Sequence, residues 1–242
     1  QSAEAAEAFD RGLATLGEGA DLAVADLLSE KAGTLARLGD ADTARGLAEV
    51  AGQLAAGLPR SREVAAVHNR VGAIFHRLGD SDRAMSHIEA GLGMSEAVGA
   101  LDLAAIALNN LGLYLGFRGE LSRAIELLLR SLEVHERLGD VEATATTAAN
   151  VGALYLRLCD LDKAQRYVDL ALRMALRFGK SFIVAVCLSN LSEVNFLRAR
   201  YAEAIEGLKR ALRMAERLGR KPEYAQWLWA LCRGWVCLGQ NG

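Results

Sequence analysis

Proline, cysteine, histidine and aromatic residues are all scarce in this chain of 242 residues. It has 2 prolines, 4 cysteines and 4 histidines, and only 6% of its residues are aromatic. With 52% hydrophobic residues and so little proline, one long helical array fits better than two globular domains. The cysteines have neither disulfide nor metal-site spacing, so we expect packing residues in a reducing, cytoplasmic compartment.

Sequence signals for chemistry and for membranes are missing as well. There is no glycine-rich phosphate loop, no histidine pair in a recognised metal motif and no nucleophile elbow. No apolar run approaches the roughly 18 uninterrupted residues that a membrane span needs. The net charge is −2, and the basic residues follow helix surfaces without interleaved aromatics. We therefore expect no enzyme, no cofactor, no metal site, no nucleic-acid partner and no membrane partner.

What the chain does contain is a pattern that recurs every forty residues. A turn closes each copy, at Gly39-Asp40, Gly79-Asp80, Gly119-Glu120, Cys159-Asp160, Ala199-Arg200 and Gly239-Gln240. An alanine lies four residues after the second residue of each of the first five turns, at Ala44, Ala84, Ala124, Ala164 and Ala204. A small residue lies eight residues before the second residue of every turn, at Ala32, Gly72, Gly112, Gly152, Ser192 and Cys232. Small residues on both sides of a turn predict two helices that approach each other closely.

The ends of the predicted helices carry signals of their own. Second helices are expected to stop at Gly99, Gly139, Gly179 and Gly219, and Pro59 takes that place in the first full copy. The turn acids precede second helices, where a carboxylate can cap free amides: Asp40, Asp80, Glu120 and Asp160. His68 takes a place that is leucine or alanine in the other copies, so we interpret it as a partly buried, hydrogen-bonded residue.

These spacings resemble the tetratricopeptide repeat, in its forty-residue variety, across essentially the whole chain. The resemblance implies an all-α fold, a right-handed α-solenoid of stacked antiparallel helix pairs. A partial repeat is expected over residues 1–20, with a second helix only, and another over residues 221–242, with a first helix only. Five full repeats are expected between them, at 21–60, 61–100, 101–140, 141–180 and 181–220. The incomplete ends indicate a piece of a longer polypeptide.

The resemblance also points to a binding surface, because first helices line the concave groove of such arrays. One position of these helices, which recurs every forty residues, is asparagine three times, at Asn110, Asn150 and Asn190. A primary amide can pair with both the N–H and the C=O of an extended peptide. The candidate groove residues are Asn69, Arg70, Asn109, Asn110, Asn150, Asn190, Glu193, Trp229 and Arg233. Alternatively, the asparagines bond a neighbouring helix and complete the packing between repeats.

Two functions follow from this interpretation. The first is a non-catalytic module that binds an extended peptide or protein segment in its groove, as the sensory or regulatory region of a larger bacterial signalling protein or transcriptional regulator. The forty-residue repeat with Asn-Asn-Leu-Gly is similar to such arrays. The second is an oligomerisation scaffold, a homodimer formed through exposed terminal helices, with Trp227 and Trp235 packing against another copy.

Overall fold

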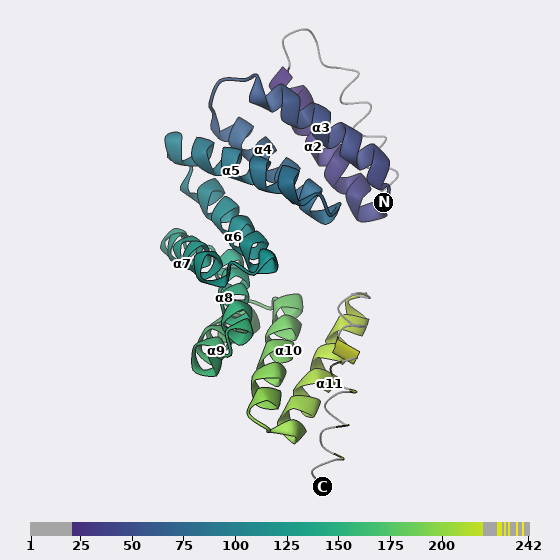
Figure 1. The fold of residues 1–242 in the computed structure, drawn as a ribbon, viewed down its shortest axis with the longest axis vertical. Coiled ribbons are helices and arrows are strands. Elements are labelled where there is room, and N and C mark those ends of the chain that lie inside the picture. The colour runs from purple at the N-terminus through teal and green to yellow at the C-terminus, as the bar shows by residue number, and fades with distance from the viewer. Residues whose placement is uncertain are drawn as a thin grey trace. The chain divides into compact units, whose positions relative to one another are not determined.

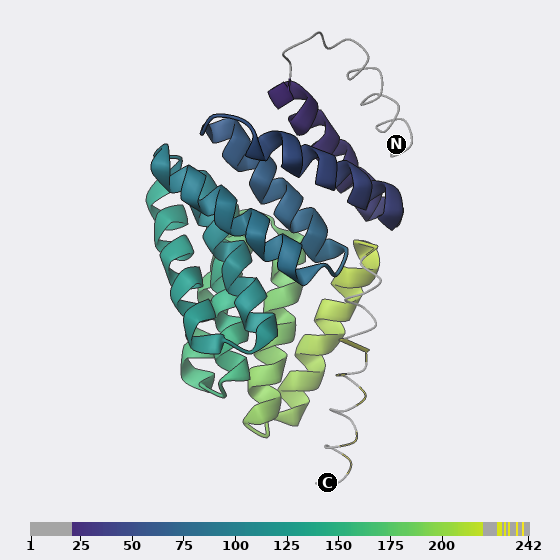
Figure 2. The ribbon, with the colours of Figure 1, turned by 45° about the horizontal axis from the view of Figure 1, so that its top comes forward.

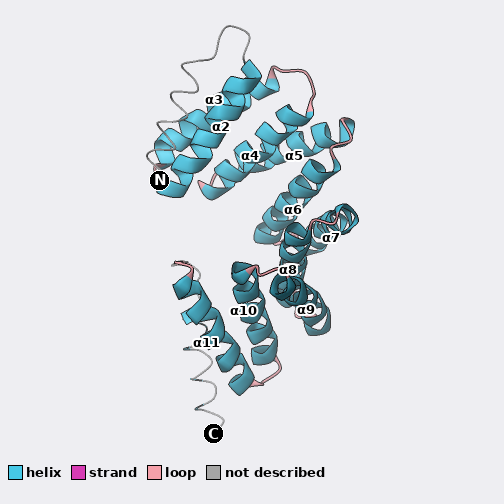
Figure 3. Ribbon diagram, turned by 180° about the vertical axis from the view of Figure 1, so that it is seen from behind, coloured by secondary structure: helices cyan, strands magenta, loops and turns pink. Residues whose placement is uncertain are grey.

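The computed structural model describes residues 21–219 and the positions 227, 228, 230, 232, 236 and 239. Over these residues the fold is an all-α solenoid of ten helices, without any strand (Figure 3). The partial repeat expected over residues 1–20 lies outside the described residues, as does most of that over 221–242. The helices are α2 Asp21–Leu38, α3 Ala41–Ala56, α4 Arg62–Arg77, α5 Ser81–Ala97, α6 Leu101–Arg118, α7 Leu121–Leu138, α8 Val141–Arg157, α9 Leu161–Arg177, α10 Ser181–Leu197 and α11 Tyr201–Arg217. None of these helices is long and apolar enough to cross a membrane.

The chain divides into two compact units, one ending at Tyr114 and one beginning at Leu115, so the division falls inside α6. We name them the N-terminal unit and the C-terminal unit and describe each by itself. In the N-terminal unit α2 packs on α3 and α4 on α5, and in the C-terminal unit α8 packs on α9 and α10 on α11 (Figure 1, Figure 2). Each pair joins the first and second helix of one forty-residue copy.

The turns between helices have the backbone that the sequence predicts. All the glycines expected to end second helices are left-handed, with φ of 70° at Gly99, 69° at Gly139, 67° at Gly179 and 66° at Gly219. Cys159 and Ala199 take the same conformation at their turns, with φ of 57° and 58°. In the first full copy α3 ends at Ala56, three residues before Pro59, whereas α5 ends at Ala97, two residues before Gly99.

Three of the four turn acids cap the helix that follows. The side chains of Asp40, Asp80 and Asp160 accept hydrogen bonds from the backbone N–H three residues on, at 3.2, 3.3 and 3.1 Å. For Glu120 the prediction was wrong, since its side chain makes no capping bond to α7. Its carboxylate instead lies 3.7 Å from both Arg118 Nε and Arg123 Nη1. The shorter aspartate side chain suits the cap better than glutamate does.

We expect Asp160→Ala to lower the free energy of unfolding by about 1 kcal/mol, because α9 loses its N-terminal cap. Glu120→Ala is the matched control, and we expect it to change that free energy by less than about 0.5 kcal/mol. Urea unfolding followed by circular dichroism measures both variants. Equal losses of unfolding free energy from the two substitutions would contradict the conclusion that Asp160 caps its helix and Glu120 does not.

Small residues permit close approach of the paired helices, as predicted. The alanines after the turns are all buried, with at most 1% of their surface exposed: Ala44, Ala84, Ala124, Ala164 and Ala204. A Cβ atom added at Gly72 would lie 2.4 Å from Ile88 Cγ1 and 3.0 Å from the carbonyl oxygen of Ala84. At Gly152 it would lie 2.5 Å from Val168 Cγ2. Backbone therefore packs nearly directly on the second helix at these two places.

The cysteines only partly follow the prediction that they are packing residues. Cys187 is fully buried, and burial raises the pKa of its thiol to about 12. Cys159 and Cys232 are exposed. Cys159 holds a turn position that is glycine or alanine in the other copies.

A pair of histidines joins α4 to α5 within the N-terminal unit. His68 is 3% exposed, and its Nδ1 lies 3.0 Å from Nδ1 of His87. The predicted hydrogen bond of His68 is therefore confirmed, and the side chain is almost fully buried rather than partly buried as expected. The His87 ring stacks on Phe75 with centroids 5.7 Å apart, and a Cβ added at Gly52 would lie 2.5 Å from His87 Cε1. Burial, followed by the nearby His87, lowers the pKa of His68 to about 4.

Candidate functional site

The first helices of neighbouring repeats form a continuous layer inside each unit. In the N-terminal unit α2 packs directly on α4, and in the C-terminal unit α8 packs directly on α10. Second helices reach the next repeat through its first helix, with α3 on α4, α7 on α8 and α9 on α10. We call the faces of α2 and α4, and of α8 and α10, the first-helix layer of each unit.

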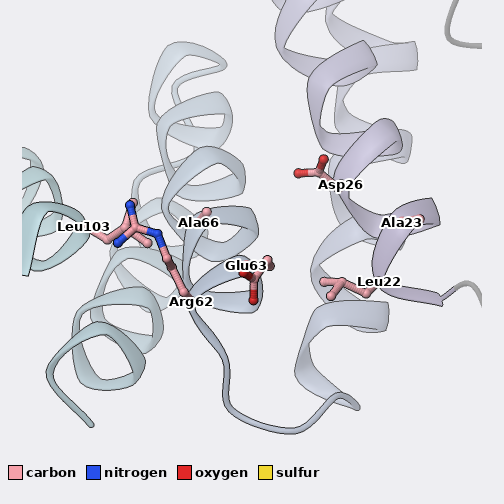
Figure 4. Close-up of a pocket in the computed structure, with 7 residues that line it drawn as sticks. All are labelled: Leu22, Ala23, Asp26, Arg62, Glu63, Ala66 and Leu103. Atoms are coloured by element: carbon pink, nitrogen blue, oxygen red, sulfur yellow. The ribbon is translucent and has the colours of Figure 1, made fainter. Parts of the chain in front are cut away.

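A cavity of about 500 Å³ opens on the first-helix layer of the N-terminal unit. This volume lies in the usual range of ligand-binding clefts. Its walls combine small and apolar residues with three charged ones, from α2, α4 and α6 (Figure 4). The lining residues are Leu22, Ala23, Asp26, Arg62, Glu63, Ala66 and Leu103.

Arg70, one of the predicted groove residues, ties the first repeat to the second. Its guanidinium lies 2.8 Å from Asp26 Oδ1 and 2.8 Å from Glu30 Oε1, and it donates to Ser29 Oγ at 2.6 Å. The side chain is 28% exposed, so it lies at the surface of the layer, although its charge is already matched by two carboxylates. Arg70 therefore acts as a brace between α2 and α4.

Asn69 does not lie on the open face that was expected for it. The side chain is 5% exposed, and its Nδ2 donates to the carbonyl oxygen of Leu103 at 3.0 Å. Its Oδ1 lies against Gly91 of α5, where an added Cβ would be 2.2 Å away. The physical reason is packing, because the side chain of Asn69 leaves α4 toward α5 and the next repeat rather than outward. Asn69 thus belongs to the scaffold.

The next two asparagines are neighbours on α6. Asn109 Nδ2 donates to Asn110 Oδ1 at 3.4 Å, and both side chains are half-buried. The amides thus contact each other.

In the C-terminal unit, the remaining described candidates lie on adjacent first helices. Asn150 of α8 is half-buried, as are Asn190 and Glu193 of α10. A second cavity, of about 430 Å³, opens at the N-terminal ends of α8 and α10. None of these three residues lines it; Glu142, Thr146 and Phe182 do. Lys180 forms an ion pair with Glu142 beside it.

The last candidates, Trp229 and Arg233, lie outside the described residues, and so does Trp235. Trp227 is described and is only 6% exposed, in the core of the C-terminal unit with Leu208 and Leu212. The expectation that Trp227 is a free dimerisation surface was therefore wrong. An indole that fills the core of its own unit is not available to a second copy.

The recurring pattern is matched by known families. Tetratricopeptide repeat models match residues 103–177 and residues 184–218. The chain is a tetratricopeptide repeat protein. Such repeats are generally non-catalytic modules for protein–protein interaction. No curated protein matches the chain significantly.

Solved structures show the same fold. BtubC (BKLC) from P. vanneervenii is 22% identical with a TM-score of 0.72, over 90% of this chain and 89% of that one. A Rap protein complexed with competence and sporulation factor is 14% identical with a TM-score of 0.67, over 100% and 72%. A Signal Transduction ATPase with Numerous Domains from Pyrococcus horikoshii, with a tetratricopeptide repeat sensor, is 16% identical with a TM-score of 0.72, over 87% and 32%.

The cavities of this tetratricopeptide repeat protein were not anticipated from its sequence, although a signal existed. Three positions near the start of the first helices, each recurring every forty residues, line both cavities; we call the residues at one such position a column. One column contributes Leu22 and Arg62 to the first cavity and Glu142 and Phe182 to the second. The other two contribute Ala23, Glu63, Leu103 and Ile183, and Asp26, Ala66 and Thr146. Reading along columns, and not only for asparagines, would have found these positions.

Proposed function

We propose that this tetratricopeptide repeat protein binds an extended segment of a protein partner along its first-helix layers, as the sensory or regulatory region of a larger signalling protein. One observation carries the proposal. Equivalent places of successive first helices line a cavity in each of the two units. A segment that runs along a repeat array meets equivalent places one repeat after another, so cavities at the same places suit such a segment.

The asparagines of the C-terminal unit add a means of holding the main chain. Asn150 and Asn190 are half-buried at equivalent places of α8 and α10, which pack directly on each other. A primary amide group has one acceptor oxygen and two donor hydrogens, so it can pair with a peptide main chain in addition to a contact within the protein. Recognition of this kind depends on the backbone of the partner, so the side-chain preference would come from the cavities.

The comparisons support a signalling role by analogy. Two neighbours of the same fold are a Rap protein complexed with competence and sporulation factor and a signal-transduction ATPase whose repeats are called a sensor. In this chain, occupation of the first-helix layer would bias the arrangement of the repeats. That bias would be passed to whatever output region accompanies them.

The test uses peptides selected from a displayed library of random, unstructured sequences. We expect the Asn150→Ala and Asn190→Ala double variant to bind the selected peptides more weakly by roughly 1–3 kcal/mol, a 5- to 150-fold loss. Isothermal titration calorimetry measures the affinities. Gln53→Ala is the control, because it removes an exposed amide from the second helix α3 and is expected to change nothing.

A second arm asks whether the main chain is what the protein recognises. Methylation of single backbone nitrogens in a selected peptide removes donors without changing side chains, and we expect affinity to fall at alternate or periodic positions. If the double variant retains full affinity with an unchanged fold by circular dichroism, the asparagines have no part in binding. If no selected peptide maps to first helices by hydrogen exchange, the proposal fails.

A further inference from the structure

The cavity of the N-terminal unit has aliphatic and acidic residues on both of the helices that flank it, α2 and α4 (Figure 4). Leu22, Ala66 and Leu103 supply the apolar surface, and Asp26 and Glu63 extend toward the space between α2 and α4 (Figure 4). An occupant of this cavity would therefore meet aliphatic carbon and a carboxylate on each of these two helices.

Arg62, which lines this cavity, and Arg70, which binds the lining residue Asp26, are both already matched by carboxylates. Arg62 makes two hydrogen bonds to Asp102, at 2.7 and 2.5 Å, and holds the pKa of that carboxyl below its usual range. Arg70 binds Asp26 and Glu30, each at 2.8 Å. An anionic occupant would have to displace a carboxylate from one of these guanidinium groups.

Glu63 is the acid that remains. Hydrogen bonds from its own backbone N–H and from the Ser61 side chain lower the pKa of this carboxyl, so it is ionised at neutral pH. No lysine or arginine among the described residues forms an ion pair with it. The charged residues that line the cavity are Asp26, Arg62 and Glu63, so two carboxylates stand against one guanidinium group and leave an excess of negative charge.

We propose that this cavity binds a basic side chain, arginine or lysine, of the segment that the first-helix layer holds. The aliphatic stem of such a side chain packs on Leu22 and Ala66, while its charged head reaches Glu63 and Asp26, which face the space between α2 and α4. A neutral apolar side chain gains only the stem contacts, and an acidic one is repelled. The inference rests on the proposed function and adds the chemistry of one partner residue to it.

The experiment compares two peptides that differ in charge alone. Acetyl-Leu-Arg-Leu-amide is titrated into the ¹⁵N-labelled protein, and the same peptide with citrulline in place of arginine is the neutral, isosteric control. We expect chemical-shift changes at the backbone amides of Leu22, Ala23 and Ala66, and about fivefold tighter binding of the arginine peptide, the scale of a partly exposed ion pair. Equal binding of the two peptides, or no shift at these amides, overturns the proposal.

Two variants localise the effect. Glu63→Gln keeps the shape of the side chain, and we expect it to reduce the arginine preference to about twofold or less. Glu89→Gln removes the same charge from an exposed place on α5 in the same unit, and we expect the preference to persist. If both variants lower the preference equally, net charge and not the cavity attracts the peptide, and the proposal is rejected. The asparagine variants of the C-terminal unit test the proposed function separately, so either idea can fail alone.

Discussion

Gly72→Leu is expected to destabilise the N-terminal unit by about 3 kcal/mol or more, the upper end of what overpacking costs. Even the first carbon of the new side chain would lie 2.4 Å from Ile88 Cγ1 and 3.0 Å from the backbone oxygen of Ala84. Ile88 is 1% exposed, so it has no open space to move into. Because the oxygen belongs to the backbone of α5, relief requires α4 and α5 to separate.

The matched control is the same substitution at Gly46 of α3. A Cβ there meets no atom within 4 Å, and the position is exposed. Since leucine is a better helix former than glycine, we expect Gly46→Leu to stabilise the protein by up to about 1 kcal/mol. Opposite signs for one chemical change would separate close packing from helix propensity.

Urea unfolding measures the loss, and hydrogen exchange shows where it falls. Because each repeat contacts mainly its neighbours, faster exchange is expected in α4 and α5 first. Gly72→Ala combined with Ile88→Ala should lose less stability than the sum of the two single variants, since the shorter side chain removes the closest contact. Additive losses would show that the Gly72 contact does not limit packing.

Most of the scaffold was predictable because it depends on local rules repeated at fixed spacing. A glycine at a helix end, an aspartate before a helix and a small residue opposite an alanine each follow from backbone sterics or hydrogen bonding within a few residues. Gly139, Asp160 and Ala164 illustrate the three rules. Repetition turned weak single signals into a fold.

The candidate site was less predictable, because it depends on the direction in which each side chain leaves its helix. Asn69 and Arg70 are adjacent in sequence, yet one is buried against Leu103 and the other remains at the surface. A step of one residue turns the direction by about 100° on a helix. Other copies have small residues at the place of Asn69, namely Ser29 and Ala149, and both are buried. Small residues at this place indicate that it faces the next repeat.

Long side chains set the second limit on prediction. The N-terminal cavity is framed by Arg62, whose guanidinium turns to Asp102 exactly one repeat further along the chain, forty residues away. A sequence shows that both residues start their helices, but it does not show which of several nearby carboxylates an arginine chooses. Comparing equivalent positions of the repeats reduces the number of candidate carboxylates for each arginine, but it does not identify the one that the arginine binds.

The second large effect is a loss of stability at low pH, and it follows from the His68–His87 pair. Two neutral imidazoles whose Nδ1 atoms lie 3.0 Å apart share one hydrogen between those atoms. Adding a proton to His68 would place a charge in a site that is 3% exposed, beside His87 and near Arg83, whose guanidinium lies 5.4 Å above the Phe75 ring that stacks on His87. The folded protein therefore resists protonation that the unfolded chain accepts.

The direction of the pH effect follows from these pKa values. The pKa of His68 is about 4 in the folded protein against an ordinary value of 6.5. Well above pH 6.5 neither state binds the proton, so His68 adds no pH dependence there. As the pH falls from 6.5 toward 4, the unfolded state takes up a proton that the folded state refuses, and stability falls. At 1.36 kcal/mol per pKa unit, the full loss is about 3 kcal/mol.

His68→Leu isolates this contribution, because leucine holds the same place at Leu28, Leu108 and Leu188. Carboxylates that titrate in the same range are common to both proteins, so the difference between their unfolding free energies reports on His68. We expect that difference to shift by about 3 kcal/mol in favour of the variant between pH 7 and pH 4. Parallel stability curves for the two proteins would mean that the folded state accommodates the charged imidazole. In that case the short Nδ1 contact opens without cost to the α4–α5 pair.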